Sequence, residues 1–492
     1  MPSSTIPQWG VFELTLRASA PPRPLIDVQL SATFRQGKHT VTVDGFWDGD
    51  DVFRVRFSPS ARGRVSYVTQ SNIAALAGHT GTFTVGPPAR NDHGPVHVDG
   101  KNPFAFRHAD GTPHSCVGTT SYVWALQPPA RATQTLRTLA RSPFNKMRMC
   151  LFPKHYRWNL QEPAAYPFGA RTIARGQAAK ADPKNWAWDF SDINPAYFQT
   201  LDERIQALQP LGVQADIILF HPYDRWGFSM MNADEDRRYL RYVIARFGAY
   251  NHVWWSLANE WDLFKTKSAE DFDRLGRFVQ AIDPHQRLRS IHNCWKVYDH
   301  SRDWITHASL QLFDDPLYED MAAARRAYGK PIVIDENRYE GNVPTDWGSL
   351  PAPALVHRFW MATITGGYNG HSETIMHPSE QFWWSHGGVL RGKSPTRLAF
   401  LRQIVESGPD APLTPSGRKV SPWAASRGSD WHLFYFGVNQ PSGWDFALPQ
   451  GRFRLELLDT WSGKRTLLAK SAKAGQTVPL PGRPHLAVLA TR

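Results

Sequence analysis

Two glutamates in the middle of the chain stand where a carboxylate is costly. Glu260 ends the run VWWSLANE and Glu336 ends the run PIVIDE, so each acid directly follows apolar residues. A charge at such a place costs free energy unless it is paired. Each acid could be a salt-bridged structural group, or the two together could perform acid–base and nucleophilic chemistry. The repeated pattern, with Asn259 directly before the first acid, favours the second interpretation.

The elements that must position these acids follow from the periodicity of residues 112–408. Short apolar runs alternate there with segments of helical period, such as Leu240, Val243, Ile244 and Phe247. Eight strand candidates, each followed by a helix or a long loop, predict an α/β fold with a (β/α)8 TIM barrel over residues 100–410. A doubly wound sheet is not favoured, since the chain has no GxGxxG and no GxxxxGK[ST] turn. The eight runs are SCVGTTSYVW, NKMRMCLF, QADIILF, HVWWSLANE, LRSIHN, HASLQLF, PIVIDE and GGYNGHSETI.

Both ends of the chain have a different pattern. Residues 1–99 contain short runs rich in Val, Thr and Phe, such as WGVFELTL and VFRVRFSPS, separated by Gly, Pro and Asp. Residues 411–492 return to this pattern with DWHLFYFG, GRFRLELLDTW, KRTLLAK and HLAVLAT. Several short strands at this spacing predict a β-sandwich domain on each side of the barrel.

In a barrel the catalytic groups lie at the C-terminal ends of the strands. This rule selects polar residues at the end of each predicted run. They are Arg148, Lys154, His155, His221, Tyr223, Asp224, Asn259, Glu260, His292, Asn293, Gln311, Asp335, Glu336, His371 and Glu373.

The positions of the two acids resemble those in a known family of enzymes. A barrel with Asn-Glu at the end of strand four and Glu at the end of strand seven resembles the retaining glycoside hydrolases of clan A, the 4/7 superfamily. Asn259 and Glu260 match the acid/base motif of that clan, Glu336 matches its nucleophile, and Arg148 in KMRMC matches the arginine that holds the nucleophile ionised. The resemblance covers residues 100–410.

The three-part layout is similar to cellulase-like glycosidases with an uncharacterised N-terminal β-domain and a small C-terminal β-domain. The segments WGVFEL, VDGFWDGD, SPFNKMRMCLFPKHY, HPYDRWGF and WWSLANEWD are typical of that group. One feature departs from the clan, whose members often place a Tyr on strand six beside the nucleophile. Strand six here reads HASLQLF, with Gln311 and Phe313, so we expect Tyr298 or Tyr339 to supply the hydroxyl from a loop.

The resemblance implies a double-displacement mechanism. Glu260 would be the acid, its pKa raised by apolar neighbours such as Trp254, Trp255 and Trp261. Glu336 would be the nucleophile, and the two carboxyl groups would lie about 5–5.5 Å apart. We expect exo action on a short oligosaccharide or glycoside, because long loops after strands two and eight (KHYRWNLQEPAAYPFGARTIARGQ and HPSEQFWWSHGG) could close one end of a cleft.

The chain is rich in aromatic residues, with 20 Trp. Sugar rings have apolar C–H faces that stack on indoles, although a single Trp is more often part of a core. Strand-end histidines and acids could likewise bind sugar hydroxyls or be buried structural groups. The predicted substrate-binding residues are Arg148, His221, Asn259, His292, Trp383, Trp384, Tyr122, Trp124, His155, His371 and Glu373.

The composition of the chain argues against some classes of binding partner. The net charge is +12, but basic residues are scattered among acids, which does not favour nucleic-acid binding. No apolar run reaches the roughly 18 residues of a membrane span. With no apolar leader and three cysteines outside any CxxC pair, we expect a cytoplasmic protein without disulfides. The expected partner is a carbohydrate, with no cofactor, no metal and no membrane; self-association is left open.

Three alternatives remain at this stage. A transglycosidase would use the same site with another acceptor. A metal-dependent barrel hydrolase is conceivable, but the strand-one HxH pair and HExxH are missing. A non-catalytic carbohydrate-binding protein would use both acids only for binding.

Overall fold

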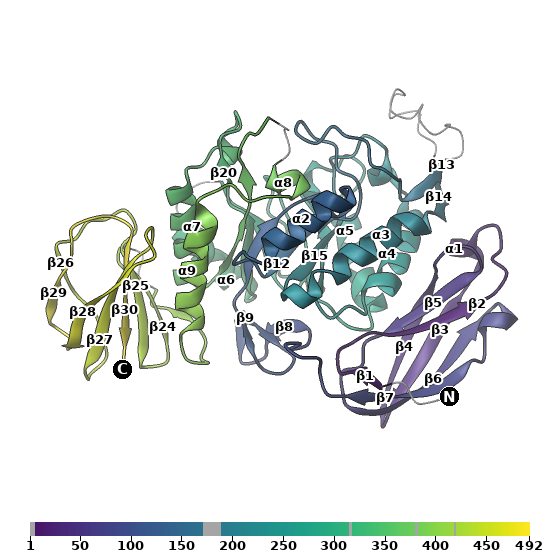
Figure 1. Cartoon of the computed structure of the whole chain (residues 1–492), viewed down its shortest axis with the longest axis horizontal. Helices are drawn as coiled ribbons and strands as arrows, with labels where there is room; N and C mark the ends of the chain where they lie inside the picture. The colour runs from purple at the N-terminus through teal and green to yellow at the C-terminus, as the bar shows by residue number, and fades with distance from the viewer. Residues whose placement is uncertain (1–4, 171–187, 314–316, 379–381, 418–419) are drawn as a thin grey trace.

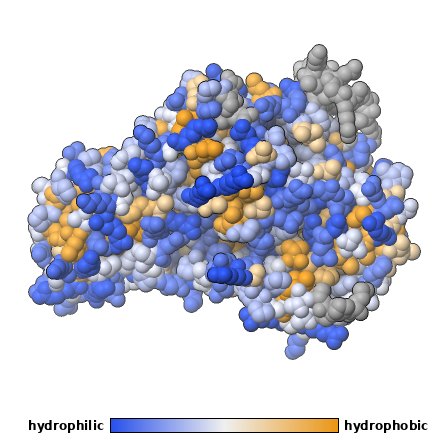
Figure 2. All heavy atoms as spheres, in the orientation of Figure 1, coloured by the Kyte–Doolittle hydropathy of each residue, from blue (hydrophilic) through white to orange (hydrophobic). Residues whose placement is uncertain are grey.

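The computed structural model of the chain describes residues 5–170, 188–313, 317–378, 382–417 and 420–492. A central barrel lies between two β-sheet units, one from each end of the chain (Figure 1). The two ends of the described chain therefore lie far apart, on the outer units. On the face shown in Figure 2, apolar residues form small groups among hydrophilic ones, as is usual for a folded protein.

Eight parallel strands follow one another round a nearly closed barrel. Neighbours in the sheet are neighbours in chain order, and the last strand returns to pair with the first. The remaining gap is spanned by a parallel bridge between His292 and Ser309. All eight predicted strands and the predicted barrel are confirmed. The strands are β11 (Val117–Thr120), β12 (Lys146–Cys150), β15 (Gln214–Phe220), β16 (Val253–Ala258), β17 (Arg289–Ser290), β18 (Ala308–Gln311), β19 (Ile332–Glu336) and β21 (Tyr368–His371).

Helices cover the outside of the barrel. The predicted apolar stripe of Leu240, Val243, Ile244 and Phe247 falls on α4. Two of these helices begin at capping boxes, which satisfy the first free N–H groups of each helix. Among the described helices, none combines the length and apolarity that crossing a bilayer requires. The helices are α2 (Pro129–Leu139), α3 (Pro195–Gln206), α4 (Ala233–Phe247), α5 (Ala269–Ile282), α6 (Leu317–Tyr328), α7 (Ala352–Ile364), the short α8 (Trp383–His386) and α9 (Ser394–Glu406).

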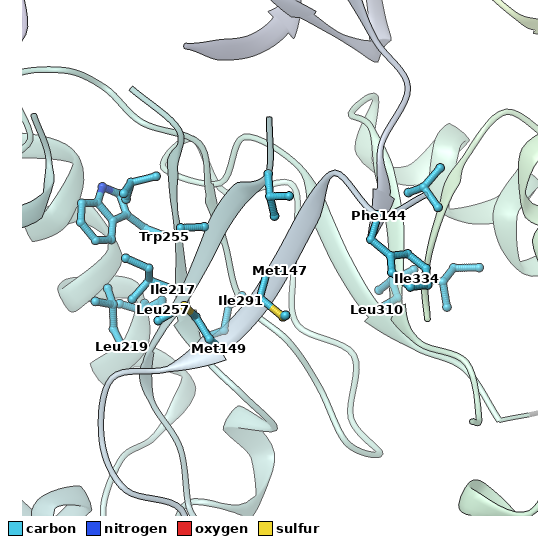
Figure 3. Packing of buried hydrophobic residues seen from close by; sticks show 14 of the residues in the cluster. Phe144, Met147, Met149, Ile217, Leu219, Trp255, Leu257, Ile291, Leu310 and Ile334 are labelled. Atoms are coloured by element: carbon cyan, nitrogen blue, oxygen red, sulfur yellow. The ribbon is translucent and has the colours of Figure 1, made fainter. Parts of the chain in front are cut away.

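The two faces of the barrel strands differ in chemistry. Apolar side chains such as Met147, Met149 and Ile217 belong to the large core that includes the helices (Figure 3). The residues between them are polar, and Lys146 on β12 lies 2.6 Å from both Asp216 on β15 and Asp335 on β19. Two strands separate β12 from β19 in the sheet, so these ionic contacts cross the barrel interior.

The N-terminal unit is a seven-stranded sheet in the order β1-β7-β6-β3-β4-β5-β2. Its β4 pairs with β3 along the first part of its length and with β5 along the last three residues. A three-stranded sheet follows and packs Val96 and Phe106 against Trp254 and Leu288 of the barrel. The strands are β1 (Thr5–Pro7), β2 (Phe12–Arg17), β3 (Leu30–Gln36), β4 (His39–Trp47), β5 (Val52–Phe57), β6 (Gly63–Ser71), β7 (Thr80–Gly86), β8 (Val96–Asp99), β9 (Asn102–His108) and β10 (Pro113–His114), with the short helix α1 (Pro24–Asp27).

The C-terminal unit is a six-stranded sheet with an additional two-stranded ribbon, and it lies beside α7 and α9 (Figure 1). Tyr435 stacks on Trp360 of α7, with ring centroids 5.3 Å apart. The described sheets confirm β-structure at both ends of the chain. The sheet contains β23 (Thr414–Pro415), β24 (Trp423–Arg427), β25 (Trp431–Tyr435), β27 (Phe453–Asp459), β28 (Arg465–Ala472) and β30 (Leu486–Thr491), and the ribbon pairs β26 (Gly443–Asp445) with β29 (Thr477–Pro479).

Candidate active site

A cleft opens at the C-terminal ends of the barrel strands. Glu260 and Glu336 both line it, in agreement with the rule that barrel sites are built at this end. Most other lining residues are aromatic or polar. They include Tyr122, Lys154, Tyr156, Tyr223, Asn293, Cys294, Trp295, Gln311, Phe313, Arg338, Tyr339, Trp347 and Trp384.

A bulge between β18 and β19 determines where Glu336 points. Leu310 pairs with Ile334, but the next residue, Gln311, pairs with Glu336, so Asp335 is an extra residue on β19. Consecutive strand residues normally point to opposite faces, and a bulge can re-aim a side chain. Asp335 contacts Lys146 in the barrel interior, and Glu336 contacts residues of the same interior.

Glu260 has an unusual backbone conformation. Its φ of 47° places it in the left-handed region as the chain leaves β16 and enters the 3-10 helix η7 (Trp261–Leu263). For a residue other than glycine this conformation costs on the order of 1–3 kcal/mol and is concentrated at functional sites. Asn259 donates a hydrogen bond from Nδ2 to Glu260 Oε2 at 3.0 Å. The strained turn therefore fixes the carboxyl group at the rim of the barrel.

Donors surround the carboxylate of Glu336. Arg148 donates to its Oε1 at 3.1 Å, and the hydroxyl of Tyr122 donates to the same oxygen. Burial opposes ionisation, but His292, Arg148, Lys154 and the Tyr122 hydroxyl outweigh it, so the pKa of Glu336 lies below its usual range. His292 lies 4.0 Å from that oxygen, and burial and Arg148 lower the pKa of its ring to about 3. His292 is therefore neutral at neutral pH, and the cations that favour ionised Glu336 are Arg148 and Lys154.

Glu260 has the opposite electrostatic environment. Burial, followed by the charge of Glu336, raises the pKa of Glu260 to about 7, although Lys154 opposes the shift. Gln311 links the two acids: with its amide nitrogen turned toward them, it donates to Glu260 Oε1 at 3.3 Å and to Glu336 Oε2 at 3.2 Å. One acid can thus be protonated while the other is ionised, which is the division of roles that acid and nucleophile need.

Lys154 is a buried cation in the wall of the cleft. Its ammonium lies 3.3 Å from the ring centroid of Tyr122, 4.3 Å from that of Tyr223 and 5.1 Å from that of Trp384. Such contacts stabilise a cation through the electron-rich ring faces. Burial lowers the pKa of Lys154 from its ordinary value.

The structure brings several of the predicted residues together. Arg148, Asn259 and His292 lie around the two acids, and Tyr122 and Trp384 line the cleft. Tyr122 supplies a hydroxyl to Glu336, and of the two tyrosines that we expected there, Tyr339 lies beside Glu336 and Tyr298 does not. Tyr298 instead donates to the carbonyl of Ala269 at 2.9 Å, whereas Tyr339 is buried beside Glu336, which together with burial raises its pKa.

Other predicted residues do not reach the cleft. Trp383 donates to Thr119 Oγ1 at 2.8 Å and belongs to the main core, as does Trp124. His221 is buried, with Nε2 3.3 Å from the carbonyl oxygen of Phe152. His155 packs its ring edge to face with Trp226 at a centroid distance of 6.1 Å. These four predictions are corrected: Trp124 and Trp383 lie on short helices, and His155 and His221 lie in loops, where the strand-end rule does not fix the direction of a side chain.

His371 and Glu373 are likewise outside the cleft. His371 stacks on Phe144 with centroids 4.5 Å apart. Glu373 and Glu340 accept four backbone N–H groups of residues 391–394, at 2.6–2.9 Å, where α9 begins. Within the part of the chain that the structure describes, Glu340, His371 and Glu373 are the one group with the spacing of metal ligands, within 4.8 Å of one another. The backbone donors already held by both carboxylates explain this cluster as the N-terminal cap of α9.

The residues that the sequence analysis did not select come mainly from loops. Tyr156 and Trp347 lie beyond the ends of β12 and β19, and Trp295 lies beyond β17. Lys154, Tyr223 and Gln311 were recognised as strand-end residues but not chosen. Their proximity to the acids depends on loop paths, for which a single sequence carries no periodic signal.

Comparison with known families agrees with the fold. A model for an apiosidase-like catalytic domain matches residues 101–375. Two models for domains of unknown function, DUF5060 and DUF5605, match residues 5–72 and 421–491. Among curated proteins, none matches the chain.

Comparison with solved structures adds full-length relatives. A candidate glycoside hydrolase from Bacteroides vulgatus shares 35% identity, with a TM-score of 0.93 over 99% of this chain and 100% of that chain. A family 5 glycoside hydrolase from the same organism shares 14% identity with a TM-score of 0.63 over 81% of this chain and 94% of that chain, and indicates the fold alone. The family model spans more than half of the chain, so the chain belongs to the apiosidase-like family and is a glycoside hydrolase.

Proposed function

We propose that this chain is a retaining glycoside hydrolase that removes the terminal sugar of a short glycoside. Glu260 is the general acid/base and Glu336 the nucleophile. The observation that carries the proposal is the single amide of Gln311 between the two carboxyl groups, at 3.3 Å from one and 3.2 Å from the other. The opposite pKa shifts of the two acids support the assignment of roles.

The separation of the acids favours retention. The two contacted oxygens can be no further apart than the sum of their distances to the Gln311 nitrogen. That upper limit equals the smallest distance between the two carboxyl groups of inverting enzymes, which is roughly 6.5–9.5 Å. In retaining enzymes the two carboxyl groups lie about 5–5.5 Å apart. An inverting enzyme needs a larger space, because a water molecule must fit between the base and the sugar.

The first step forms a glycosyl-enzyme. The ionised carboxylate of Glu336 attacks the anomeric carbon while the bond from that carbon to the leaving oxygen breaks. Glu260 gives its proton to the leaving oxygen, so the leaving group departs as a neutral alcohol. Arg148 and Tyr122 hold the nucleophilic carboxylate in place and ionised before the attack.

The second step is hydrolysis. Glu260, now a carboxylate, takes a proton from water as the water oxygen attacks the anomeric carbon. The bond to Glu336 breaks, and both carboxyl groups return to their starting states. The configuration at the anomeric carbon is inverted twice and is therefore retained.

Aromatic loops close one side of the cleft, which supports exo action. Trp158, after β12, packs against Trp347, after β19, with centroids 5.5 Å apart, and against Phe382, after β21, at 6.1 Å. Trp347 in turn lies 5.2 Å from Trp384. Parts of both predicted loops, residues 171–177 and 379–381, lie outside the described residues. In the described parts, the aromatic rings connect the loops after β12, β19 and β21 across the mouth of the barrel. This arrangement is suited to a pocket for one terminal sugar.

The flanking units are proposed to be sandwich domains that support the barrel. Arg56 of the N-terminal unit donates to both oxygens of Asp202 on α3, at 2.6 and 3.2 Å. Tyr435 of the C-terminal unit accepts or donates a hydrogen bond with His357 of α7 at 2.8 Å. These contacts are buried or half-buried, so both units are fixed to the helices that surround the site.

The test is product release from a panel of aryl glycosides, with aryl apiosides included because of the family's description. We expect one sugar to be cleaved with retained configuration, as followed by NMR of the product. Glu336→Gln should lose activity by several orders of magnitude. Glu260→Gln should keep turnover of activated aryl glycosides when azide is added, because azide needs no general base.

The matched control is Glu270→Gln, since Glu270 lies on the solvent side of α5. It should behave as the wild-type protein. Equal cleavage by the wild-type protein, Glu336→Gln and Glu260→Gln would reject the proposed roles of both acids. An inverted product would reject retention alone.

A further inference from the structure

A pair of stacked aromatic rings at the open side of the cleft has no role in the mechanism above. We propose that Trp295 and Phe313 form the subsite for the leaving group, and that this subsite takes a ring with a flat apolar face, either a pyranose or an aryl ring. The inference rests on the proposed function, because it needs Glu260 as the acid that protonates the leaving oxygen.

The exposure of Trp295 is the first observation. Its side chain is 74% exposed, although its ring stacks on Phe313 with centroids 5.2 Å apart and planes 26° from parallel. Both residues line the same cleft as the two acids. A large apolar ring turned toward solvent in a cleft leaves surface that a ligand can bury.

The backbone beneath this ring is held firmly, which is the second observation. The carboxylate of Asp262 accepts hydrogen bonds from three consecutive N–H groups, those of Cys294 at 2.6 Å and of Trp295 and Lys296 at 2.8 Å each. On the other side, the carbonyl of Phe313 accepts a hydrogen bond from Arg358 at 3.2 Å. The exposed ring is therefore presented in a fixed place before any ligand arrives, which reduces the entropy lost on binding.

Asp262 also connects this subsite to the acid. It lies two residues after Glu260 in η7, so one short segment carries both the general acid and the anchor of the Trp295 loop. Cys294, next to Trp295, lies against Glu260, and burial and this neighbouring acid raise the pKa of its thiol. The acid must lie next to the leaving oxygen, so the Trp295 side of Glu260 is the side on which the leaving group sits.

The rings of Trp158, Trp347 and Trp384 form the closed wall on loops that follow β12, β19 and β21, whereas Trp295 and Phe313 follow β17 and β18. A terminal sugar bound between Glu336 and this closed wall would have its scissile bond directed toward the open side. The rings of Trp295 and Phe313 are there, together with Val297, which is 45% exposed and lines the same cleft. An apolar face at this place fits the carbon-bound hydrogens of a ring better than a flexible alkyl chain.

The kinetic test compares leaving groups that share one sugar. The probes are its 4-nitrophenyl glycoside, its glycosyl fluoride, and a disaccharide in which it is linked to glucose. Trp295→Ala should raise KM about 10-fold for the two probes with a ring in the leaving group. It should change kcat/KM of the glycosyl fluoride by less than about twofold, because fluoride cannot reach the ring pair. An effect on the aryl probe alone would assign the subsite to aryl rings, and one on the disaccharide alone to sugar rings.

Two variants serve as controls. Trp295→Phe keeps a flat ring and should recover most of the loss. Leu467→Ala removes an apolar side chain that is 40% exposed on β28, far from the cleft, and should change none of the three reactions. A loss for the fluoride as large as the loss for the probes with a ring, or no loss for any of the three probes with Trp295→Ala, would overturn the proposal.

A binding measurement does not depend on turnover. Saturation-transfer NMR of the 4-nitrophenyl glycosides with Glu336→Gln should give strong transfer to the aryl protons. Adding Trp295→Ala should reduce this transfer several-fold and leave transfer to the sugar protons unchanged. Absence of transfer both to the aryl protons of every glycoside and to the glucose protons of the disaccharide would reject the subsite. Turnover that survives Glu336→Gln would instead reject the proposed function, so the two failures can be told apart.

Discussion

Asp335 and Glu336 are consecutive residues whose side chains both enter the barrel interior. The register shift opposite Gln311 makes this arrangement possible. Asp335 is neutralised by Lys146 at 2.6 Å, and Glu336 by Arg148 at 3.1 Å. The two acids therefore have separate cationic partners, and Arg148 remains available to the candidate nucleophile.

The first prediction concerns the cation shared by two buried acids. Lys146→Met would leave Asp216 and Asp335 without the ammonium that lies 2.6 Å from each. Removing one partner of a buried ion pair costs about 3–5 kcal/mol, because an uncompensated charge remains. We expect the free energy of unfolding, measured in urea, to fall by that amount. Lys101→Met, at an exposed turn, should leave it within about 0.5 kcal/mol of the wild-type value. An unchanged urea midpoint for Lys146→Met would contradict the role of this triad.

The second prediction concerns the dependence of activity on pH. Glu260 must be protonated to act as acid, and its pKa is raised to about 7. The value of kcat/KM should therefore fall as pH rises through about 7. Glu336 must be ionised, and because its pKa is lowered, activity should persist well into the acidic range. A profile that rises through pH 7 would reverse the assigned roles.

The third prediction uses Lys154 to shift that profile. Its ammonium lowers the pKa of Glu260, so Lys154→Met should raise that pKa and move the basic limb to higher pH. The pKa of Glu336 should rise as well, because the same cation favours its ionised form. Both limbs should thus move upward together. A fall in kcat with both limbs unmoved would indicate that Lys154 acts only by contact with the substrate.

The fourth prediction concerns the hydroxyl beside the nucleophile. Tyr122→Phe removes one donor from Glu336, so its pKa should rise and the acidic limb should move to higher pH. We expect kcat to fall about 10- to 100-fold, since loss of one charge-assisted hydrogen bond costs about 1.5–3 kcal/mol. Tyr298→Phe is the matched control, because that hydroxyl binds the carbonyl of Ala269 away from the acids. Equal effects of the two substitutions would point to a general loss of packing.

The barrel was predictable because its strands are short apolar runs separated by helices with a clear apolar stripe. The strand-end rule then located Glu260 and Glu336, which are adjacent in space although 76 residues apart in the sequence. The prediction that Trp383 and Trp384 both bind the substrate does not hold for Trp383. They lie on the short helix α8, where Trp383 turns to Thr119 in the core and only Trp384 reaches the cleft.

The other errors have a similar physical origin. A residue at a strand end can point into the barrel or toward the helices, and a single shifted residue reverses the direction. His371 points to Phe144, outside the cleft, for this reason. The bulge that turns Glu336 inward depends on pairing between β18 and β19, and the aromatic wall depends on loop paths. Neither leaves a periodic pattern in the sequence.

The last prediction concerns the attachment of the N-terminal unit. Asp202 on α3 accepts hydrogen bonds from Arg56 of that unit and from Arg246 of α4, at 2.6 and 2.7 Å, and all three side chains are buried. Asp202→Ala leaves two guanidinium groups facing each other without their shared carboxylate. We expect a loss of about 3–5 kcal/mol in stability. If the contact fixes the unit to the barrel, calorimetry should resolve the single unfolding transition into two, with the N-terminal sheet unfolding first. Asp50→Asn, in the exposed turn before β5, should retain one transition. Two transitions already present in the wild-type protein would mean that this ionic contact does not couple the sheet to the barrel.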